Sequence, residues 1–460
     1  MLDTVITGGE VVTEGSASPA TIGIRGGTIA AVVAPDVPLE ARERIDATGK
    51  LVFPGLVDPH VHFQTEGPIR FPEDFGDTSI AAAHGGVTTF VPYIWSEPGG
   101  KIGPNLERYL RIGAERSVVD FVLHCGLWPD PVVIDQIPDA FALGITSFKM
   151  MMAYRATGRL VYDDHLLQAM DLIADRGGLL IVHAESGLVI DYLERRFQRQ
   201  GKVAPEFYLK SHPTVTEHEA IHRLTLLAEL MGCELYVPHI TSKDGVGEVL
   251  AARARGQRVY AETCPHYLAL TNQDVVDQAG FAKIGPPIRE EQELHALWAA
   301  IRGGTMDTIG SDHAPWTLAD KRKAEGDIFK VPYGSAGIET MLPVVYTEGV
   351  RRGRISLARM VELLSTNPAR IFGLFPKKGT LRVGADADLV VFDPAVEWTV
   401  RATELHGKTD FICFEGRKVH GRAVLTMLRG KPLVKEGRIV QQPGFGRFVR
   451  RTPDGRAPVA

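Results

Sequence analysis

The feature of this sequence that most constrains its fold is a long alternation of apolar runs and amphipathic stretches, from about residue 55 to residue 379. The apolar runs have the length of buried strands, and they recur at 88–93, 118–125, 145–152, 179–183, 234–239, 258–263 and 308–311. Helical patterns lie between them, for example at 164–176 and 217–231. Strands that alternate with helices predict a parallel sheet, and a (β/α)8 TIM barrel closes such a sheet most economically.

The two ends of the chain share a different pattern, in which short strands alternate with glycine turns. Residues 1–54 show it first, and residues 380–440 return to it after the long middle. We therefore expect a small β-sandwich domain built from 1–54 and 380–440, beside a catalytic barrel at 55–379. The tail at 441–460 is rich in Gly, Pro and Arg, which predicts either disorder or an arm onto a neighbouring subunit.

Composition and charge exclude several classes of partner. The net charge of -5 gives no basic surface for nucleic acid or an anionic membrane. No apolar run approaches the ~18 residues of a membrane-spanning helix, and no secretory signal is visible at the start. The four cysteines are far apart and form no C-x-x-C, which is typical of free thiols in a reducing compartment. We expect a cytoplasmic protein.

Metal-ligating side chains stand at the ends of the predicted strands, where barrel enzymes carry their functional groups. His60 and His62 share one face of a strand in V-D-P-H-V-H. Four further candidates lie in or at the end of later runs: Lys149, His183, His239 and Asp312. Imidazole and carboxylate ligands suit zinc, with manganese or cobalt as alternatives. A buried lysine is costly, but reaction with CO2 turns Lys149 into an anionic carbamate that can bridge two ions.

A second histidine pair suggests a different class of enzyme. His218-Glu-Ala-Ile-His222 matches H-E-x-x-H, the zinc-protease motif. Thr216 and Glu219 have capping-box spacing, however, and that gives Glu219 a structural role at a helix start. We prefer this structural interpretation, and we expect His266 and His313, near the barrel rim, to support the site without binding metal.

Taken together, the motifs resemble the cyclic amidohydrolases, the group of hydantoinases, dihydropyrimidinases, allantoinases and dihydroorotases within the amidohydrolase superfamily. The resemblance spans essentially the whole chain, and its motifs include P-G-L-V-D-P-H-V-H, S-F-K-M-M-M-A-Y, H-A-E, H-I-T-S, E-T-C-P-H-Y-L, G-P-P-I-R, G-S-D-H-A-P and G-A-D-A-D-L-V-V-F-D. It implies two divalent ions per chain and a homo-oligomer, either a tetramer or a dimer.

The resemblance also implies a role for each site residue. Six ligands would hold the ions, with the carbamate of Lys149 shared between them: His60, His62, Lys149 and Asp312 at the more buried ion, and Lys149, His183 and His239 at the other. A metal-bridging hydroxide would attack the amide carbonyl. Asp312 would move the proton to the leaving nitrogen, and Tyr154 would stabilise the oxyanion.

Several positions bear on the substrate. Dihydroorotases have the pattern H-x-H-x-R, in which the arginine holds the carboxylate of the substrate. This sequence has the neutral Gln64 at that position, which argues against a ring that carries a carboxylate. Tyr154 favours the hydantoinase and dihydropyrimidinase branch over allantoinases. The backbone at Gly285 and Ala336 would bind the ring, although the family usually has Ser and Asn there. Four aromatic residues could form an apolar cup or simply pack: Phe63, Phe71, Trp95 and Trp316.

These observations predict a binuclear-metal hydrolase that opens a cyclic amide, either a hydantoin- or dihydropyrimidine-type ureide or a related imide. An allantoinase is the alternative within the group. A non-catalytic, hydantoinase-like scaffold is the alternative from another class, and the complete set of ligands argues against it.

Overall fold

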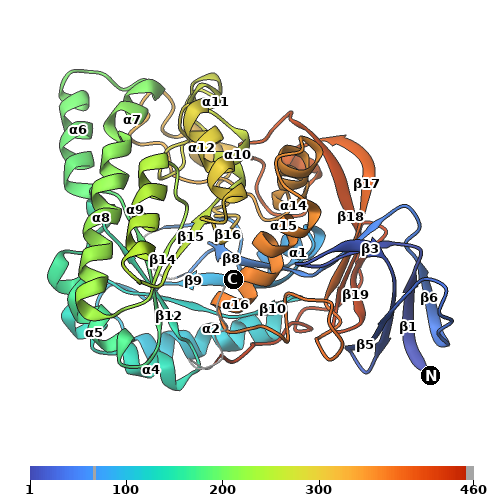
Figure 1. Ribbon diagram of the computed structural model, residues 1–460. Coiled ribbons are helices and arrows are strands. Elements are labelled where there is room, and N and C mark those ends of the chain that lie inside the picture. Colours follow the sequence, from blue (N-terminus) through green and yellow to red (C-terminus); the bar gives the residue numbers. More distant parts are fainter. Residues whose placement is uncertain (66–68, 452–460) are drawn as a thin grey trace.

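Eight parallel strands form the barrel of the computed structural model, which describes residues 1–65 and 69–451 (Figure 1). They are β8 (Leu56–Val61), β9 (Val87–Ile94), the interrupted pair β10 (Asp120–Phe121) and β11 (His124–Gly126), β12 (Ser147–Met151), β13 (Leu179–His183), β14 (Leu235–Val237), β15 (Val259–Thr263) and β16 (Thr308–Ile309). The His62 N–H donates to His313 O at 2.7 Å, which links the segment after β16 back to β8. The predicted (β/α)8 barrel is confirmed.

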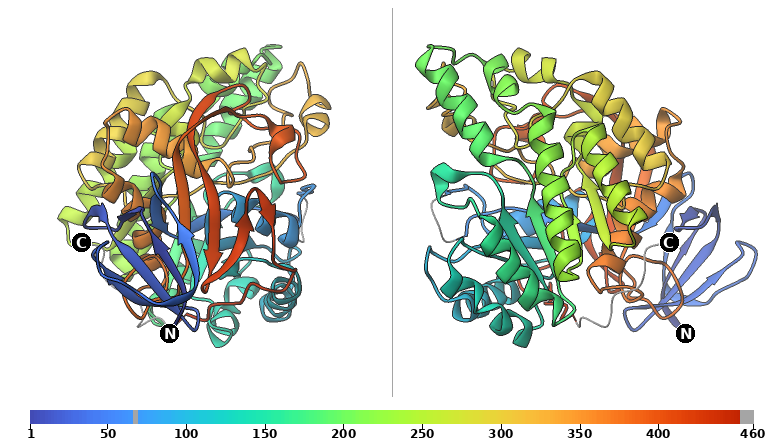
Figure 2. Two further views of the ribbon diagram at one scale, coloured as in Figure 1. Left: turned by 90° about the vertical axis from the view of Figure 1, so that its right-hand side faces the viewer. Right: turned by 60° about the vertical axis from the view of Figure 1, so that its left-hand side comes forward.

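Helices cover the outside of the barrel (Figure 2). They are α1 (Phe75–His84), α2 (Ile102–Arg116), α3 (Pro131–Ile134), α4 (Ile137–Ala142), α5 (Asp163–Ala174), α6 (Gly187–Arg199), α7 (Pro205–Ser211), α8 (Thr214–Met231), α9 (Lys243–Ala254), α10 (Pro265–Ala269), α11 (Asn272–Asp277), α12 (Glu291–Arg302), α13 (Leu318–Arg322), α14 (Met341–Val345), α15 (Leu357–Val361) and α16 (Asn367–Ile371). Short 3-10 turns η1 (Arg155–Thr157) and η4 (Ala402–Glu404) and π-helical turns η2 (Tyr346–Arg351) and η3 (Glu362–Thr366) complete the set. On α5 the buried residues Leu166, Ala169, Met170 and Ile173 follow the helical period, which explains why that face lies on the barrel.

Two sheets beside the barrel form the predicted sandwich from both ends of the chain. One sheet has the order β5 (Thr28–Val33), β4 (Thr21–Arg25), β1 (Leu2–Thr7), β6 (Ala41–Asp46). The other has the order β20 (Arg438–Ile439), β19 (Lys431–Lys435), β18 (Lys418–Leu428), β17 (Leu389–Thr399), β7 (Leu51–Pro54), β2 (Glu10–Val12), β3 (Ala17–Pro19). The antiparallel pair β7–β17 joins the two ends, and apolar side chains from both sheets form one core.

A buried ion network ties the barrel to this sandwich. The Lys378 ammonium lies 2.5 Å from Asp120 in β10, 2.9 Å from Asp386 and 2.6 Å from Asp388. Arg429 also pairs with Asp120. Two cations thus face three carboxylates, so this acidic cluster is already satisfied by the protein's own side chains.

The prediction of a capping box at the start of α8 is wrong. The helix begins at Thr214, so Thr216 lies inside it and donates its hydroxyl to Pro213 O at 2.7 Å. Glu219 instead pairs with Arg223, one turn further along, at 3.0 Å. Pro213 occupies the N-cap position, and its φ of -63° lets the helix start one turn earlier than the T-x-x-E spacing suggested.

The prediction of disorder for the tail is wrong over residues 441–451, the alternative of an arm onto a neighbouring subunit stays a prediction, and residues 452–460 lie outside the described part of the chain. The Val449 N–H donates to Phe121 O at 2.9 Å. The Arg451 guanidinium donates to Leu123 O and to Ser147 Oγ, both at 2.9 Å, and Arg451 is only 2% exposed. This segment therefore packs on the barrel of its own chain, because backbone groups of β10 and the segment that follows it accept and donate the hydrogen bonds it needs.

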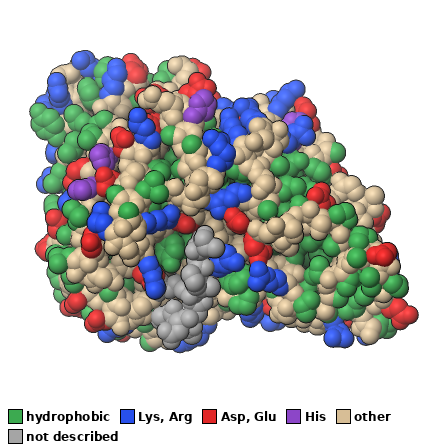
Figure 3. All heavy atoms as spheres, in the orientation of Figure 1, with side chains coloured by type: hydrophobic (Ala, Val, Ile, Leu, Met, Phe, Trp, Pro, Cys, Tyr) green, Lys and Arg blue, Asp and Glu red, His purple; other side chains and the backbone are tan. Residues whose placement is uncertain are grey.

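The distribution of surface charge and the state of the cysteines are as the net charge and the cysteine spacing predicted. Acidic and basic side chains are interspersed over most of the face in Figure 3. Cys125, Cys233, Cys264 and Cys413 are all free and buried. Among the described helices, none combines the length and the apolar character needed to cross a bilayer.

Candidate active site

All six predicted ligands line one cavity of about 370 Å³ at the C-terminal ends of the barrel strands. They are His60 in β8, His62 just after it, Lys149 in β12, His183 at the end of β13, His239 after β14 and Asp312 after β16. The sequence separates them by up to 252 positions (312 minus 60), and the closed sheet brings them to one rim.

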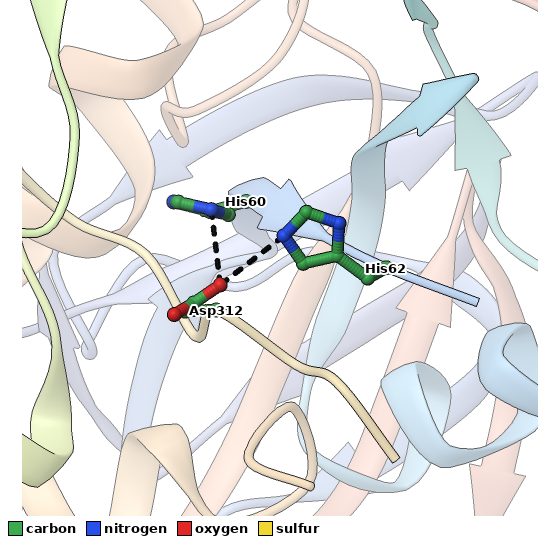
Figure 4. A group of neighbouring side chains, drawn as sticks. All are labelled: His60, His62 and Asp312. Atoms are coloured by element: carbon green, nitrogen blue, oxygen red, sulfur yellow. Dashed lines mark ion pairs between the residues drawn. The ribbon is translucent and has the colours of Figure 1, made fainter. Parts of the chain in front are cut away.

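Three of these side chains converge around one carboxylate oxygen. His60 Nε2 lies 3.0 Å and His62 Nε2 lies 3.2 Å from Asp312 Oδ1 (Figure 4). Burial would raise the pKa of Asp312, but the two facing rings outweigh it and hold that pKa well below its usual value. The carboxylate is therefore ionised and available to a cation.

Two further histidines of the cavity contact each other through their rings. His183 Nδ1 lies 3.0 Å from His239 Nε2. Glu185 Oε2 accepts from His183 Nε2 at 2.8 Å, so the other ring nitrogen is the one that faces His239. Burial lowers the pKa of both rings, that of His239 well below its usual value. Both are thus neutral imidazoles, the form that binds metal ions.

Glu262 at the end of β15 is a residue that the sequence analysis missed. Its Oε1 lies 2.6 Å from His60 Nδ1 and accepts from the His239 backbone N–H at 3.2 Å. Its Oε2 accepts from the Tyr236 hydroxyl at 2.7 Å. Glu262 thus fixes the His60 ring so that its Nε2 faces Asp312. Its place within E-T-C-P-H-Y, at a strand end, was the available signal.

Lys149 is buried without a partner. It is 1% exposed, and no described residue accepts a hydrogen bond from its Nζ, which lies 5.0 Å from the centre of the Tyr93 ring. Burial lowers the pKa of Lys149 to about 8, although the carboxylates of Asp312 and Glu262 oppose that change. An amine with this pKa is partly uncharged at neutral pH and can act as a nucleophile.

Backbone strain gathers at the same rim. Six non-glycine residues of the described chain have a positive φ, and three of them belong to this site: Tyr154 at 63°, His239 at 45° and Asp312 at 47°. The left-handed region costs such residues about 1–3 kcal/mol, so it persists where the surroundings fix it. The strain turns each side chain out of the strand direction and into the cavity.

A model described as "Amidohydrolase family" matches residues 51–432, which is most of the chain. The chain belongs to the amidohydrolase family. Among its relatives, the D-hydantoinase of Ralstonia pickettii is 38% identical over 98% of this chain and 99% of that protein. The L-hydantoinase of Paenarthrobacter aurescens is 36% identical over 98% of each chain. The crystal structure of dihydropyrimidinase from Brevibacillus agri NCHU1002 superposes with a TM-score of 0.94, at 33% identity and over 100% of both chains.

These hydantoinase and dihydropyrimidinase names do not favour the allantoinase alternative. Both are names of enzymes, and this amidohydrolase matches the proteins that bear them over nearly its whole length, including the segments that form the sandwich. The H-E-x-x-H pair lies elsewhere in this amidohydrolase. His218 and His222 both contact Glu248 on α9, at 2.8 and 2.9 Å, and neither lines the cavity.

The predicted ring-binding positions of this amidohydrolase fall in different places. Gly285 lines the cavity, and its carbonyl oxygen lies 3.5 Å from Tyr154 Oη. A Cβ at position 285 would come within 2.4 Å of that hydroxyl and 3.0 Å of the Tyr333 ring, so glycine fits where Tyr154 and Tyr333 pack. Ala336, by contrast, is buried and is not among the residues that line the cavity.

Three of the four aromatic residues that were candidates for an apolar cup line the cavity, and the fourth does not. Phe71, Trp95 and Trp316 line the cavity, and the rings of Phe71 and Trp316 lie 4.9 Å apart. Phe63 belongs to the core, where its ring packs 4.9 Å from that of Phe75.

The rim histidines expected to support the site differ in their contacts. His313 Nε2 lies 3.0 Å from Glu73 Oε2, and its Nδ1 accepts from the Gly337 N–H at 3.1 Å. Its two nitrogens are therefore occupied. His266 Nε2 is buried and has no hydrogen-bond partner among the described residues.

Proposed function

We propose that this amidohydrolase opens a cyclic amide, either a hydantoin- or dihydropyrimidine-type ureide or a related imide, with the help of two divalent ions. The observation that carries the proposal is Lys149, a buried amine without a hydrogen-bond partner among the described residues, which lines the same cavity as the five other candidate ligands. A carbamate on that amine would supply the shared anion that two adjacent cations need. The names of the full-length relatives support the same class of substrate.

The donor atoms fit such a pair of ions. His60, His62 and Asp312 would hold one ion, His183 and His239 the other, and carbamylated Lys149 both. Glu262 and Glu185 each engage the far nitrogen of a ligand ring and so leave the near nitrogen available. When bound, zinc, or manganese or cobalt in its place, would activate a water molecule and polarise the amide carbonyl.

Two side chains of the protein, Asp312 and Tyr154, would take part directly in the reaction. Asp312 is ionised at the rim, so its carboxylate can accept a proton from the attacking water and deliver it to the leaving ring nitrogen. Burial raises the pKa of the Tyr154 hydroxyl well above its usual value, so the group stays protonated. It can therefore donate a hydrogen bond to the oxygen that becomes negative as the carbonyl is attacked.

Gly285 would bind the ring through its backbone. Its carbonyl oxygen faces the cavity beside Tyr154 and can accept an N–H of a cyclic amide. The corresponding role of the Ala336 backbone stays a prediction, as do a homo-oligomer of two or four chains and a cytoplasmic location.

A ring-opening assay tests the proposal. Purified protein would be supplied with Zn²⁺, Mn²⁺ or Co²⁺ and bicarbonate, and then given hydantoin, a 5-aryl hydantoin, dihydrouracil, allantoin, dihydroorotate and glutarimide. We expect turnover of at least one ureide or imide and two metal ions per chain by elemental analysis. Metal loading without turnover of any ring would favour the scaffold alternative, and a chain that binds no metal would overturn the proposed mechanism.

A further inference from the structure

Besides Lys149, the cavity has a second buried basic side chain without a hydrogen-bond or ion-pair partner among the described residues. Arg159 follows η1, is 8% exposed and lines the same cavity as the six ligands. Among the described residues, no carboxylate forms an ion pair with it and no acceptor takes a hydrogen bond from its guanidinium, although its Nε is fully buried. Burying a charge without a partner is costly, so such a group needs an explanation.

The other buried arginines of the described chain show what a structural guanidinium does. Arg289 is 7% exposed and donates to Thr241 Oγ1 at 2.9 Å and to His212 O. Arg451 is 2% exposed and donates to Leu123 O and Ser147 Oγ. Each of them connects separate segments through acceptors of the protein, whereas Arg159 connects none.

Two tryptophans hold the Arg159 guanidinium in place. Its Cζ lies 4.5 Å from the centre of the Trp95 ring and 5.7 Å from that of Trp128. The two rings pack edge to face, 5.6 Å apart, and Trp128 Nε1 donates to Ser96 O at 2.9 Å. A guanidinium beside aromatic faces gains cation–π attraction and keeps its in-plane N–H donors for another partner.

The metal centre does not need Arg159 as a counter-charge. Two dications would face the anions of Asp312 and carbamylated Lys149, so the centre keeps a positive surplus without any further cation. Arg155, on the same loop, also lines the cavity, but its side chain is exposed to solvent. Arg159 is thus a fixed, preorganised positive charge at the wall of a cavity that is lined by apolar side chains such as Phe71 and Trp316 and by the carboxylates of Asp191 and Glu194.

We propose that Arg159 binds a carboxylate carried on the exocyclic arm of the substrate ring. The planar fork of a guanidinium matches a carboxylate with two parallel hydrogen bonds. This inference rests on the proposed function for the ring chemistry and adds the class of substituent. The proposed carboxylate is on the exocyclic arm and not on the ring. Near the ring, the neutral side chain of Gln64 already forms hydrogen bonds with the backbone of Thr65 and Phe71.

The first test compares two hydantoins of equal size, 5-(2-carboxyethyl)hydantoin and 5-(2-carbamoylethyl)hydantoin, together with the pair that is one methylene shorter. The readout is the ratio of kcat/KM for acid over amide on the same protein, which cancels differences in active fraction. We expect the metal-loaded enzyme to favour the acid by about 100-fold, the effect of a buried charge pair. Arg159→Met should bring the ratio near one, and Arg159→Lys should give an intermediate ratio because it keeps the charge and loses the fork. Arg111→Met, at an exposed position of α2 that does not line the cavity, is the matched control and should keep the wild-type ratio.

A second measurement does not depend on turnover. Calorimetry would compare the binding of N-carbamoylglutamate and N-carbamoylglutamine, the ring-opened forms of the longer pair. We expect the glutamate compound to bind at least about tenfold more tightly, and Arg159→Met to remove the difference.

The two readouts separate the two proposals. If no ring is opened but calorimetry shows the acid preference, the anion site stands and the proposed function fails. If neutral rings are opened and neither readout distinguishes acid from amide, the proposed function stands and the role of Arg159 is wrong.

Discussion

At the scale of single residues, two of the candidate ligands are oriented by a carboxylate. Glu185 orients His183, and Glu262 orients His60. A ring held in this way keeps one nitrogen toward the cavity without further ordering when a cation binds. Lys149 differs from these ligands because nothing in the described protein holds its Nζ.

Lys149→Ala should remove metal and activity together, because the shared anion is lost. Metal content by elemental analysis and turnover of the best ring would be measured on the same sample. Added short carboxylates, such as acetate, should restore part of both, since they can occupy the space left by the carbamate. A Lys149→Ala enzyme that keeps two ions and full activity would show that the bridge is assigned wrongly.

Burial lowers the pKa of Lys149 to about 8, and this predicts how the formation of the carbamate, and with it of the metal site, depends on pH. Only the uncharged amine attacks CO2, and its fraction rises as the pH increases from 7 to 9. At a fixed concentration of dissolved CO2, the rate of reactivation of metal-free enzyme should therefore rise about tenfold between pH 7 and pH 8.5 and then level off. A rate that is flat over this range would argue against an amine with this pKa.

Tyr154→Phe should lower kcat by roughly ten- to a thousandfold, the scale of one oxyanion donor. The metal content should stay unchanged, because Tyr154 is not a ligand. An unchanged kcat would exclude its hydroxyl from the mechanism.

The candidate ligands, which the structure brings to one cavity, could be predicted from the sequence, whereas the residues that hydrogen-bond to them could not. His60, His183 and Asp312 could be found because a strand end and a ligand type are both local features. The contact of His60 with Glu262 joins positions 202 apart, and it depends on which strands become neighbours in the barrel. Arg159 was missed for a related reason, since a lone arginine in a loop gives no sign that it will be buried.

At the scale of elements, two loops meet across the cavity. The segment after β12 carries Tyr154, and the segment between α11 and α12 carries Gly285. The missing side chain at Gly285 makes room for the Tyr154 hydroxyl, so the departure from the usual serine of the family is matched by local packing.

Gly285→Ala should displace the Tyr154 hydroxyl and lower kcat about tenfold, because small misplacements of a catalytic group are costly. In a Tyr154→Phe background the same substitution should cost much less, since the atom that it meets is absent. A double-mutant cycle on kcat measures the coupling, and simple additivity would show that the two loops act independently.

Helix α8 shows the limit of local signals for an element. T-x-x-E at Thr216 and Glu219 is a good capping pattern, and Pro213 lies just before it. The structure begins the helix at Thr214, and Pro213 occupies the N-cap position in an extended conformation. The sequence therefore predicted correctly that a helix is present, but it did not predict the role of the first residues of that helix.

At the scale of the whole molecule, the chain is held together where its barrel meets its sandwich. Lys378 links Asp120 of the barrel to Asp386 and Asp388 just before β17. The two domains could be predicted from their patterns of strands, helices and turns. The ion network around Lys378 joins residues up to 268 positions apart (388 minus 120), so it leaves no local pattern in the sequence. The tail up to Arg451 was missed in the same way, because its composition resembles that of a free end.

Lys378→Met should lower the free energy of unfolding by roughly 3–5 kcal/mol, because three buried carboxylates would share the single cation of Arg429. Thermal and denaturant midpoints measure the loss. Lys377→Met is the matched control at an exposed neighbouring position, and it should stay within about 0.5 kcal/mol. Equal midpoints for the two variants would mean that the network does not stabilise the fold.

The pairing of β7 with β17 also sets an order of events on the ribosome. When Pro54 has been made, its partner Leu389 is still 335 residues away (389 minus 54). At ~5–20 residues per second, translation of that stretch takes roughly 20–70 s. During this time one edge of β7 has no strand beside it and can pair with another nascent chain. The yield of this protein in a cell should therefore depend on whether chaperones cover that edge until the last strands emerge.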